Sequence, residues 1–247
     1  MVNTDQILHT LNKYFEYTGK VTIDPHTGAV SCTGSVRCTD SKVSQLPVKF
    51  DKVRGNFHIM WGSLVTLEGA PHWVGKNFTC YNNKLTSLAH APSHVGGSFD
   101  CGKNQLKSLA HAPVHIGKDF SCAFNELTTL DHAPSRVNGY FFCMVNQLTS
   151  LQGAPRVVMG ELRCWGNKFQ SLEGVPEEIQ GIIWLDASDQ LPMLKLLAVQ
   201  GLTEVVIGHH INKMADILNK YVGKGKAAML NCALELKKAG LRGNAAW

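Results

Sequence analysis

The chain has 247 residues, of which 44% are hydrophobic and 17% charged, with a formal net charge of +5 and a mean hydropathy of -0.07. This length suits one sizeable core or two modest ones. No segment approaches the roughly 18–20 apolar residues of a membrane-spanning helix, and MVNTDQILHTLNKYFEYTG lacks the basic and apolar regions of a signal peptide. We therefore expect a cytoplasmic protein whose mild positive charge falls short of a nucleic-acid-binding signature.

Residues 1–33 predict a helix followed by a hairpin. Residues 3–17 place their apolar side chains on one helical face, with Asn3 or Thr4 as the N-cap. The segment KVTIDPHTGAVSCTGSV then alternates in polarity as a β-hairpin does, with its turn at DPHTG. We expect both elements to cap the repeats that follow, because the first coil of a solenoid exposes an apolar cross-section.

A repeat of 21 residues organises positions 34–187 into about seven to eight units. Five columns keep this interval in register. They are the prolines Pro71, Pro92, Pro113, Pro134, Pro155 and Pro176; the leucines Leu67, Leu88, Leu109, Leu130, Leu151 and Leu172; the cysteines Cys80, Cys101, Cys122, Cys143 and Cys164; the asparagines Asn83, Asn104, Asn125, Asn146 and Asn167; and the apolar positions Phe57, Phe78, Phe99, Phe120, Phe141, Leu162 and Ile183.

Each repeat predicts one coil of a solenoid. Phe-x-Cys alternates like a strand with one buried face, and Asn-x-Leu-x-x-Leu turns the chain inward again. Ala-Pro or Val-Pro predicts an extended return segment outside any sheet, because proline fixes φ and lacks a donor. Stacked coils then form a parallel sheet with neighbouring strands about 4.8 Å apart.

The asparagine and cysteine columns predict structural roles. A buried asparagine amide can both donate to and accept from backbone groups that the turn leaves in the interior, and losing one costs about 1–3 kcal/mol. The cysteines share the buried strand face with the phenylalanines. We expect reduced thiols in the core, because disulfides between adjacent parallel strands are geometrically awkward and no Cys-x-x-Cys pair suggests a metal.

The spacing Phe99-x-Cys101-x-x-Asn104-x-Leu106-x-x-Leu109 resembles the leucine-rich repeat pattern L-x-L-x-x-N-x-L-x-x-L. The short unit with proline in its second half resembles the bacterial and bacteriophage variety of that family. The resemblance implies an α/β solenoid: a curved coil stack with a parallel β-sheet on its concave face, little helix on the other side, an N-terminal helix and hairpin cap and a C-terminal helical cap. Gly62 and Ser41 replace the asparagine in the first two units.

Residues 188–247 depart from the repeat and predict a helical module. The segments QLPMLKLLAVQGL, INKMADILNKYVG and KAAMLNCALELKKAGL have helical periodicity and are separated by glycines. This part can be an enlarged cap or a module with a site of its own. Its lysines indicate either a solvated helix face or contact with an acidic partner or nucleic acid, and YVGKGKAAML lacks the spacing of a phosphate-binding loop.

Two histidine columns raise the question of a metal. His90, His111 and His132 form one column, and His94 and His115 form another. Duplication of the repeat explains both, since no acidic residue accompanies them regularly; a zinc or nickel site is the alternative. We predict no metal and no cofactor. We also predict no enzyme, because no catalytic motif is present, and we interpret Cys232 as a buried thiol in a helix.

The side chains that alternate with the buried columns predict the binding surface. On the later coils they are aromatic residues, methionine and arginine, types enriched in interface hot spots, with a glutamate beside them. The predicted contact residues are Phe124, Tyr140, Phe142, Met144, Glu161, Arg163, Trp165 and Trp184. A second possibility is that the C-terminal helices fold back and cover this patch.

We therefore predict a non-catalytic protein-binding module that acts through the concave face. The family resemblance implies a protein encoded by a phage or bacterium, with a host protein, such as one of a defence system, as its partner in the bacterial cytoplasm. The alternative is a protein that captures nucleic acid or nucleotides, with the aromatic residues stacking on bases and the basic tail holding phosphates. An enzyme whose site lies in the tail is a third possibility.

Overall fold

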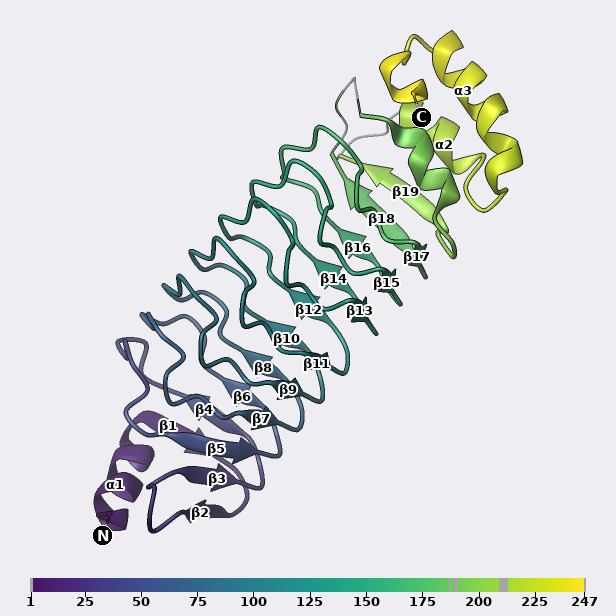
Figure 1. Cartoon of the computed structure of the whole chain (residues 1–247). Coiled ribbons are helices and arrows are strands. Elements are labelled where there is room, and N and C mark those ends of the chain that lie inside the picture. The colour runs from purple at the N-terminus through teal and green to yellow at the C-terminus, as the bar shows by residue number, and fades with distance from the viewer. Residues whose placement is uncertain (1, 187, 189–190, 209–212, 247) are drawn as a thin grey trace. The chain divides into compact units, whose positions relative to one another are not determined.

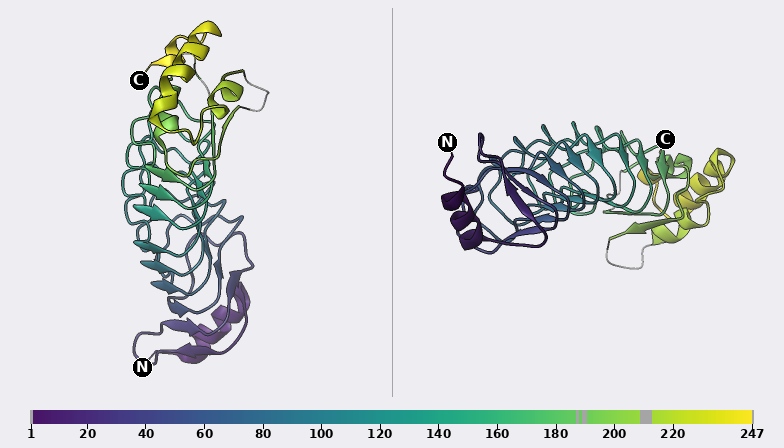
Figure 2. Two further views of the ribbon diagram at one scale, coloured as in Figure 1. Left: turned by 90° about the vertical axis from the view of Figure 1, so that its right-hand side faces the viewer. Right: turned by 90° about the horizontal axis from the view of Figure 1, so that it is seen from below.

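The protein is a parallel-strand β-solenoid of about eight turns with a short N-terminal helix, seen here as a computed structural model (Figure 1). The structure describes residues 2–186, 188, 191–208 and 213–246. The chain divides into two compact units, Met1–Asn125 and Glu126–Trp247. Within each unit the strands stack one coil above the next (Figure 2).

The main sheet of the first unit confirms the predicted strand column. Its strands, in spatial order, are β1 (Phe15–Tyr17), β4 (Val36–Cys38), β6 (Phe57–His58), β8 (Phe78–Thr79), β10 (Phe99–Asp100) and β12 (Phe120–Ser121). β1 is antiparallel to β4, and the other pairs are parallel. Phe57, Phe78, Phe99 and Phe120 lie directly opposite one another, so a step of one repeat moves the chain by one strand.

A second sheet runs through the return segments, and the prediction that these segments lie outside any sheet is wrong. Its strands in the first unit are β2 (Val21–Ile23), β3 (Val30–Cys32), β5 (Phe50–Val53), β7 (Trp73–Val74), β9 (His94–Val95) and β11 (His115–Ile116). Proline does not prevent this pairing, because it precedes the hydrogen-bonded residues: after Pro92, the Ser93 N–H donates to the His72 carbonyl at 3.0 Å. The missing donor of proline therefore removes no bond from the sheet.

The N-terminal helix and hairpin are both present. α1 spans Thr4–Tyr14, and the Asn3 side chain caps it by accepting the Gln6 N–H at 3.0 Å. The helix ends earlier than predicted because Phe15–Tyr17 forms β1. Strands β2 and β3 form the predicted antiparallel hairpin. Two backbone N–H groups of its turn donate to Asp24 and hold the pKa of that carboxyl below its usual range.

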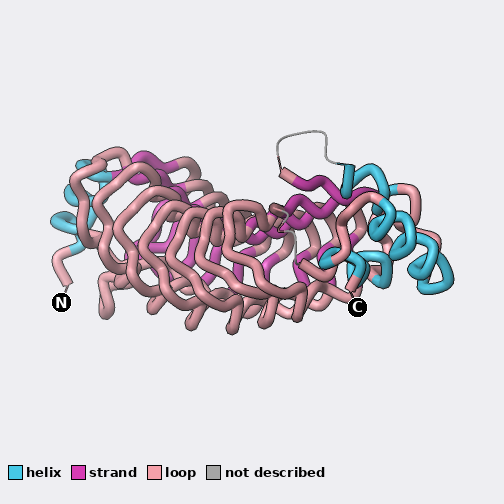
Figure 3. The backbone as a smooth tube through the Cα atoms, turned by 90° about the horizontal axis from the view of Figure 1, so that it is seen from above, coloured by secondary structure: helices cyan, strands magenta, loops and turns pink. Residues whose placement is uncertain are grey.

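The second unit continues the repeat and adds helices. Its main-sheet strands are β14 (Phe141–Phe142), β16 (Leu162–Arg163), β18 (Ile182–Leu185) and β19 (Glu204–Ile207), and its return strands are β13 (Arg136–Val137), β15 (Val157–Val158) and β17 (Glu178–Ile179). The helices are α2 (Lys213–Asn219) and α3 (Met229–Lys238), with short 3-10 segments η1 (Met193–Ala198), η2 (Lys226–Ala228) and η3 (Gly243–Ala245). Figure 3 shows the coils as loop and short strand, with helix only near the chain ends.

Of the three predicted C-terminal helices, the second and third are confirmed as α2 and α3, and the first is wrong. The first predicted helix is a single 3-10 segment, η1, and the sequence reading missed β19, which pairs parallel with β18. The β-branched run EVVI of β19 favours a strand, and a neighbouring unpaired strand edge is available to it. Residues 187, 190 and 211–212 of the predicted boundaries lie outside the described residues, and the predicted three-part division stays a prediction.

The core consists of the repeated columns. The phenylalanine rings stack along the first unit, with centroids of Phe78 and Phe99 5.4 Å apart and nearly parallel. Cys101 and Cys122 are buried on neighbouring coils, as predicted, and the Cys101 thiol donates to the Ser121 carbonyl at 3.3 Å. The repeat cysteines are reduced and form no disulfide in the described part of the chain, and burial raises the pKa of the Cys101 thiol.

The asparagine column forms a buried ladder that joins successive coils. Asn104 donates to the carbonyls of Cys80 and Cys101, both at 3.0 Å, and accepts the Leu85 N–H at 3.0 Å. Cys80 and Leu85 belong to the preceding coil, so each amide bonds to its own coil and to the one before. The same contacts recur at Asn83 and Asn125 in the first unit and at Asn167 in the second. Asn146 likewise accepts the Leu127 N–H and donates to the Cys143 carbonyl.

Helices that could cross a membrane were sought among the described residues, and none combines the necessary length with the necessary apolar character.

Substituting Asn104→Ala should lower the free energy of unfolding by about 1–3 kcal/mol, because it leaves the buried Leu85 N–H without its acceptor and removes one of two asparagine donors from each of the Cys80 and Cys101 carbonyls. Urea unfolding followed by circular dichroism measures this loss. Gln105→Ala, at the exposed neighbouring position, is the matched control and should change stability by less than about 0.5 kcal/mol. Equal losses for the two variants would contradict the role of the ladder.

Candidate functional site

The candidate site lies on the outer sheet face of the second unit, the face opposite the buried Phe141, Leu162 and Ile183. Side chains alternate across a strand, so the residue after each buried one points outward. Phe142, Arg163, Trp184 and Val206 occupy this position on adjacent strands and are directly opposite one another. Strand pairing therefore gathers into one row residues that are far apart in the sequence.

Arg163 is the centre of this row. Its guanidinium lies 5.5 Å from the Phe142 ring centroid and 5.4 Å from that of Trp184. Its Nε and Nη2 donate to Glu161 Oε2 at 2.9 Å and 2.8 Å. Cation–π contact and two charge-assisted bonds fix the guanidinium plane, so the aromatic groups are held in a defined arrangement.

A cavity of about 210 Å³, the Trp pocket, opens beside this row. Its lining residues are Arg163, Trp165, Trp184, Leu185, Asp186, Val206 and Gly208. The Trp184 Nε1–H is buried and has no hydrogen-bond acceptor among the described residues. Asp186 accepts the Gly166 N–H, which holds its carboxylate at the pocket wall. The walls of the pocket are thus mostly apolar.

The structure brings together seven of the eight predicted contact residues in the second unit. Tyr140 is 47% exposed and its ring lies 5.8 Å from that of Phe142. Met144, Glu161 and Trp165 are half-buried around the same row. Phe124, which is 39% exposed, belongs to the first unit.

The C-terminal helices leave this surface open in the described part of the chain. α2 packs against β19 and η1, and α3 packs against α2 and η1. The Arg163 side chain stays 42% exposed. Val206 and Gly208 were absent from the predicted contact residues because they lie in or directly after β19, a strand that was not predicted. The β-branched run EVVI could have indicated this strand.

The same row in the first unit is polar. Arg37, His58, Thr79, Asp100 and Ser121 are opposite one another on successive strands. Burial raises the pKa of Asp100 even though its carboxylate accepts the Gly102 N–H at 2.9 Å. Burial, with a smaller contribution from Arg37, lowers the pKa of His58. Thr79 separates His58 from Asp100, so the two do not form an acid–base pair.

A cavity of about 300 Å³ lies at one end of this polar row, and its lining includes Glu16, Arg37, His58 and Trp61. His58 Nδ1 is buried and has no hydrogen-bond partner in the described part of the chain. Trp61 is 59% exposed, and the Lys103 ammonium lies 5.4 Å from its ring centroid. This end of the first unit combines an exposed aromatic ring with cationic groups.

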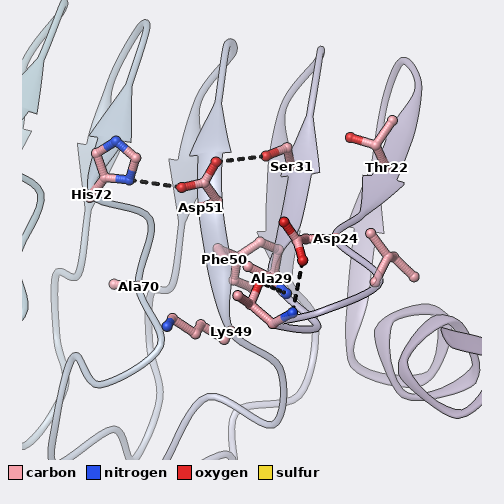
Figure 4. Close-up of a pocket in the computed structure, with 11 residues that line it drawn as sticks. Thr22, Asp24, Ala29, Ser31, Lys49, Phe50, Asp51, Ala70 and His72 are labelled. Carbon is pink, nitrogen blue, oxygen red and sulfur yellow. Dashed lines mark hydrogen bonds and ion pairs between the residues drawn. The ribbon is translucent and has the colours of Figure 1, made fainter. Parts of the chain in front are cut away.

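A larger groove of about 680 Å³ lies on the second sheet of the first unit (Figure 4). There Asp51 accepts from Ser31 at 3.2 Å and contacts His72 Nδ1 at 3.1 Å. These residue types form catalytic triads, but here the carboxylate lies between the serine and the histidine (Figure 4). His72 therefore cannot take the proton of Ser31, and the arrangement does not activate a nucleophile.

The first histidine column has a backbone explanation. His90, His111 and His132 have φ of 67°, 69° and 69°, and the column continues with Gly69, Gly153 and Gly174 at φ of 87°, 81° and 78°. Each coil thus needs a left-handed residue here, which glycine supplies freely and histidine tolerates better than most residues. In the second column the His94 and His115 rings stack 4.4 Å apart. No group of three or more potential metal ligands occurs among the described side chains.

Comparisons with protein-family models, with curated proteins and with solved structures find no match for this chain.

The left-handed column predicts that two substitutions at His111 differ in their effect on stability. His111→Gly should change the free energy of unfolding by less than about 1 kcal/mol, because glycine adopts this φ without strain. His111→Val should lower it by about 1–2 kcal/mol, because a β-branched residue is strained there. Urea unfolding compares them, and equal stability would show that the conformation does not determine the residue.

Proposed function

We propose that this protein is a non-catalytic protein-binding module that docks its partner on the outer sheet face of the second unit. The cluster of exposed Tyr140 with half-buried Phe142, Arg163 and Trp184 carries this proposal. These side chains lie outside the buried columns that form the core of the coils. Rigid aromatic groups around an immobilised arginine lose little conformational entropy on binding, which favours a protein interface.

We further propose that the coils are leucine-rich repeats of the bacterial and bacteriophage variety and that this face is the concave one. The repeat pattern supports the family, and the terminal contacts support the assignment of caps. At the N-terminal end, β1 closes the main sheet with an antiparallel strand and α1 buries Leu11. At the other end, the Asn219 side chain accepts the Val205 N–H of β19 at 2.7 Å and donates to the Val205 carbonyl at 3.0 Å. These bonds prevent another strand from pairing with β19 at this residue.

The partner we propose is a host protein in the bacterial cytoplasm, such as one of a defence system, and the present chain is encoded by a phage or a bacterium. This step rests on the family resemblance alone. The chemistry of the surface adds that the partner contributes apolar and uncharged groups, because Arg163 is already paired with Glu161.

Replacing both Phe142 and Trp165 by alanine should abolish partner capture while preserving the fold. The full chain and the double variant are immobilised and exposed to bacterial lysate, and the captured proteins are identified by mass spectrometry. A protein retained by the wild type is then purified and its binding measured by calorimetry, where the double substitution should weaken it at least about 100-fold.

The matched control removes two apolar side chains elsewhere. Trp73→Ala with Val114→Ala changes the first unit, where Val114 is 90% exposed, and should leave capture intact. Thermal unfolding verifies that both double variants remain folded. Capture that survives the Phe142 and Trp165 substitutions would disprove the proposed surface.

Capture of nucleic acid or nucleotides is the second candidate, and the first unit favours it. Exposed Trp61 offers a stacking surface, and Lys103 and Arg37 lie beside the polar cavity. Within the basic tail, Lys220 is already paired with Glu235. Repeating the capture from about 50 mM to about 200 mM salt separates the candidates, since phosphate contacts weaken steeply with salt and an aromatic protein interface does not.

A further inference from the structure

We propose that the cavity beside Trp61 in the first unit binds a nucleobase that carries a phosphate, with the base stacked on the Trp61 ring. Lys103 is the main phosphate contact, and Arg37 adds a second positive charge. The inference rests on the second candidate function and is independent of the docking surface in the second unit. A strained backbone position, an open aromatic ring and the charges around it support the proposal.

The backbone at Trp61 belongs to a second left-handed column, which follows each main-sheet strand. Its members in the first unit have φ between 53° and 58° and are Trp61, Asn82, Lys103 and Phe124. Asparagine tolerates this conformation, as Asn82 does one coil after Trp61, whereas a bulky side chain is strained in it. Strain of this kind persists where the side chain serves a function, so the tryptophan needs a reason other than backbone preference.

Packing of the coil does not explain the tryptophan either. Trp61 is 59% exposed, whereas the neighbouring Phe57 and Leu64 are buried in the core. The Tyr81 ring makes a T-shaped contact with Trp61, with centroids 5.4 Å apart, and the Lys103 ammonium lies 5.4 Å from the Trp61 centroid. These surface contacts orient the ring and leave most of the residue open to a ligand. An open aromatic face accepts any base, because every base has a π-face.

The charge around this ring favours an anionic ligand. Residues 1–125 contain 12 Lys and Arg and 8 Asp and Glu, a difference of +4, out of a formal net charge of +5 for the whole chain. Lys103 and Arg37 are exposed, and neither forms an ion pair within the described part of the chain. Glu16 lies opposite Arg37 on the neighbouring strand, so Lys103 attracts a phosphate more strongly than Arg37 does.

The cavity has the size and the lining of a small nucleotide site. Its volume is about 300 Å³, at the lower end of the roughly 300–1,000 Å³ of small-ligand sites. Met60 and Trp61 supply apolar contacts, and the hydroxyls of Thr39 and Ser41 can donate to and accept from a base or a sugar. An apolar side chain of a protein partner leaves these hydroxyls and cations without partners, so a nucleotide matches the lining better.

Indole N–H resonances of the full-length, ¹⁵N-labelled chain test the proposal. The probe is adenosine monophosphate, and of the 5 tryptophans Trp61 is identified by the resonance that Trp61→Asn removes. We expect a saturable upfield shift of the Trp61 indole proton, because a stacked base places this proton in its ring current. Raising the salt from about 50 mM to about 300 mM should weaken this binding about threefold, whereas adenosine, which lacks the phosphate, should bind equally at both concentrations.

Two variants and a control separate the two contacts. Measured by saturation transfer to adenosine monophosphate, binding should be at least about tenfold weaker for Trp61→Asn. Lys103→Gln should weaken binding of the monophosphate about fivefold and leave adenosine binding unchanged. Val65→Ala removes another exposed apolar side chain of the same coil and should leave both unchanged.

Thermal unfolding of Trp61→Asn tests the argument from strain separately. The melting temperature should stay constant or rise by up to about 4 °C, because asparagine relieves the strain and the core loses nothing. A melting temperature lower by more than about 4 °C would show that the ring is needed for packing, and the case for a ligand-binding tryptophan would fail.

The proposed ligand chemistry occurs both in a free nucleotide and in single-stranded nucleic acid, and an octamer of deoxyadenosine distinguishes the two sources. Octamer binding more than about tenfold tighter than that of adenosine monophosphate assigns the site to a single strand. A smaller difference assigns it to a free nucleotide. In both cases Trp61→Asn should abolish the binding, and octamer binding that survives this substitution overturns the stacking role of Trp61.

The remaining outcomes separate this inference from the proposed protein-binding function. The nucleotide site is overturned if adenosine monophosphate leaves Trp61 unmoved up to about 20 mM. It is also overturned if the neutral amide N-acetylphenylalanine methylamide shifts Trp61 more strongly than the monophosphate does. Neither result affects the docking surface, which depends on loss of capture in the Phe142→Ala, Trp165→Ala variant. If the monophosphate binds and capture survives that double substitution, the docking surface is overturned and the nucleotide site stands.

Discussion

The buried asparagine amide is the interaction on which this architecture depends. Each one satisfies backbone groups of its own coil and of the preceding coil, as Asn104 does with Cys101, Cys80 and Leu85. Such a bond can form only if the two coils have the same length and the same phase. Because an unsatisfied buried amide is costly, the ladder penalises any coil of a different length. The equal spacing of the other columns follows, since phenylalanine stacks on phenylalanine only when the coils are in register.

Regular coils leave the outward positions free to vary. The buried side of each strand is nearly constant, whereas the outward row is polar in the first unit and aromatic in the second. The same backbone thus presents His58 and Asp100 in one unit and Phe142 and Trp184 in the other. Fold and binding surface are specified by different columns of the repeat, and a binding surface can change without loss of the core. The Trp pocket also depends on β19, which supplies Val206 outside the repeat.

The sequence predicts the buried columns well because each has a strong physical requirement that recurs at a fixed interval. Phe99, Cys101 and Asn104 were all placed correctly. The return sheet was missed because proline indicates a segment outside any sheet, whereas Pro92 precedes the hydrogen-bonded Ser93 and removes no donor from the pairing. Histidine and glycine share the column of Gly69 and His111, which indicates a left-handed backbone conformation. The sequence analysis instead considered these histidines as metal ligands. The Trp pocket was beyond prediction, since it required knowing that β19 pairs with β18.

Removal of one complete coil tests most directly whether constant coil length holds the structure together. Deleting residues 97–117 takes out 21 residues and joins Gly96 to Lys118, so every column remains in phase. Deleting residues 97–116 removes one residue fewer and moves every later column out of phase with the coils before it. We expect the first deletion variant to unfold cooperatively in urea. The slope of its unfolding free energy against urea concentration should fall in proportion to the smaller surface exposed on unfolding. The second variant should lose cooperative unfolding. Equivalent behaviour of the two deletions would contradict the account.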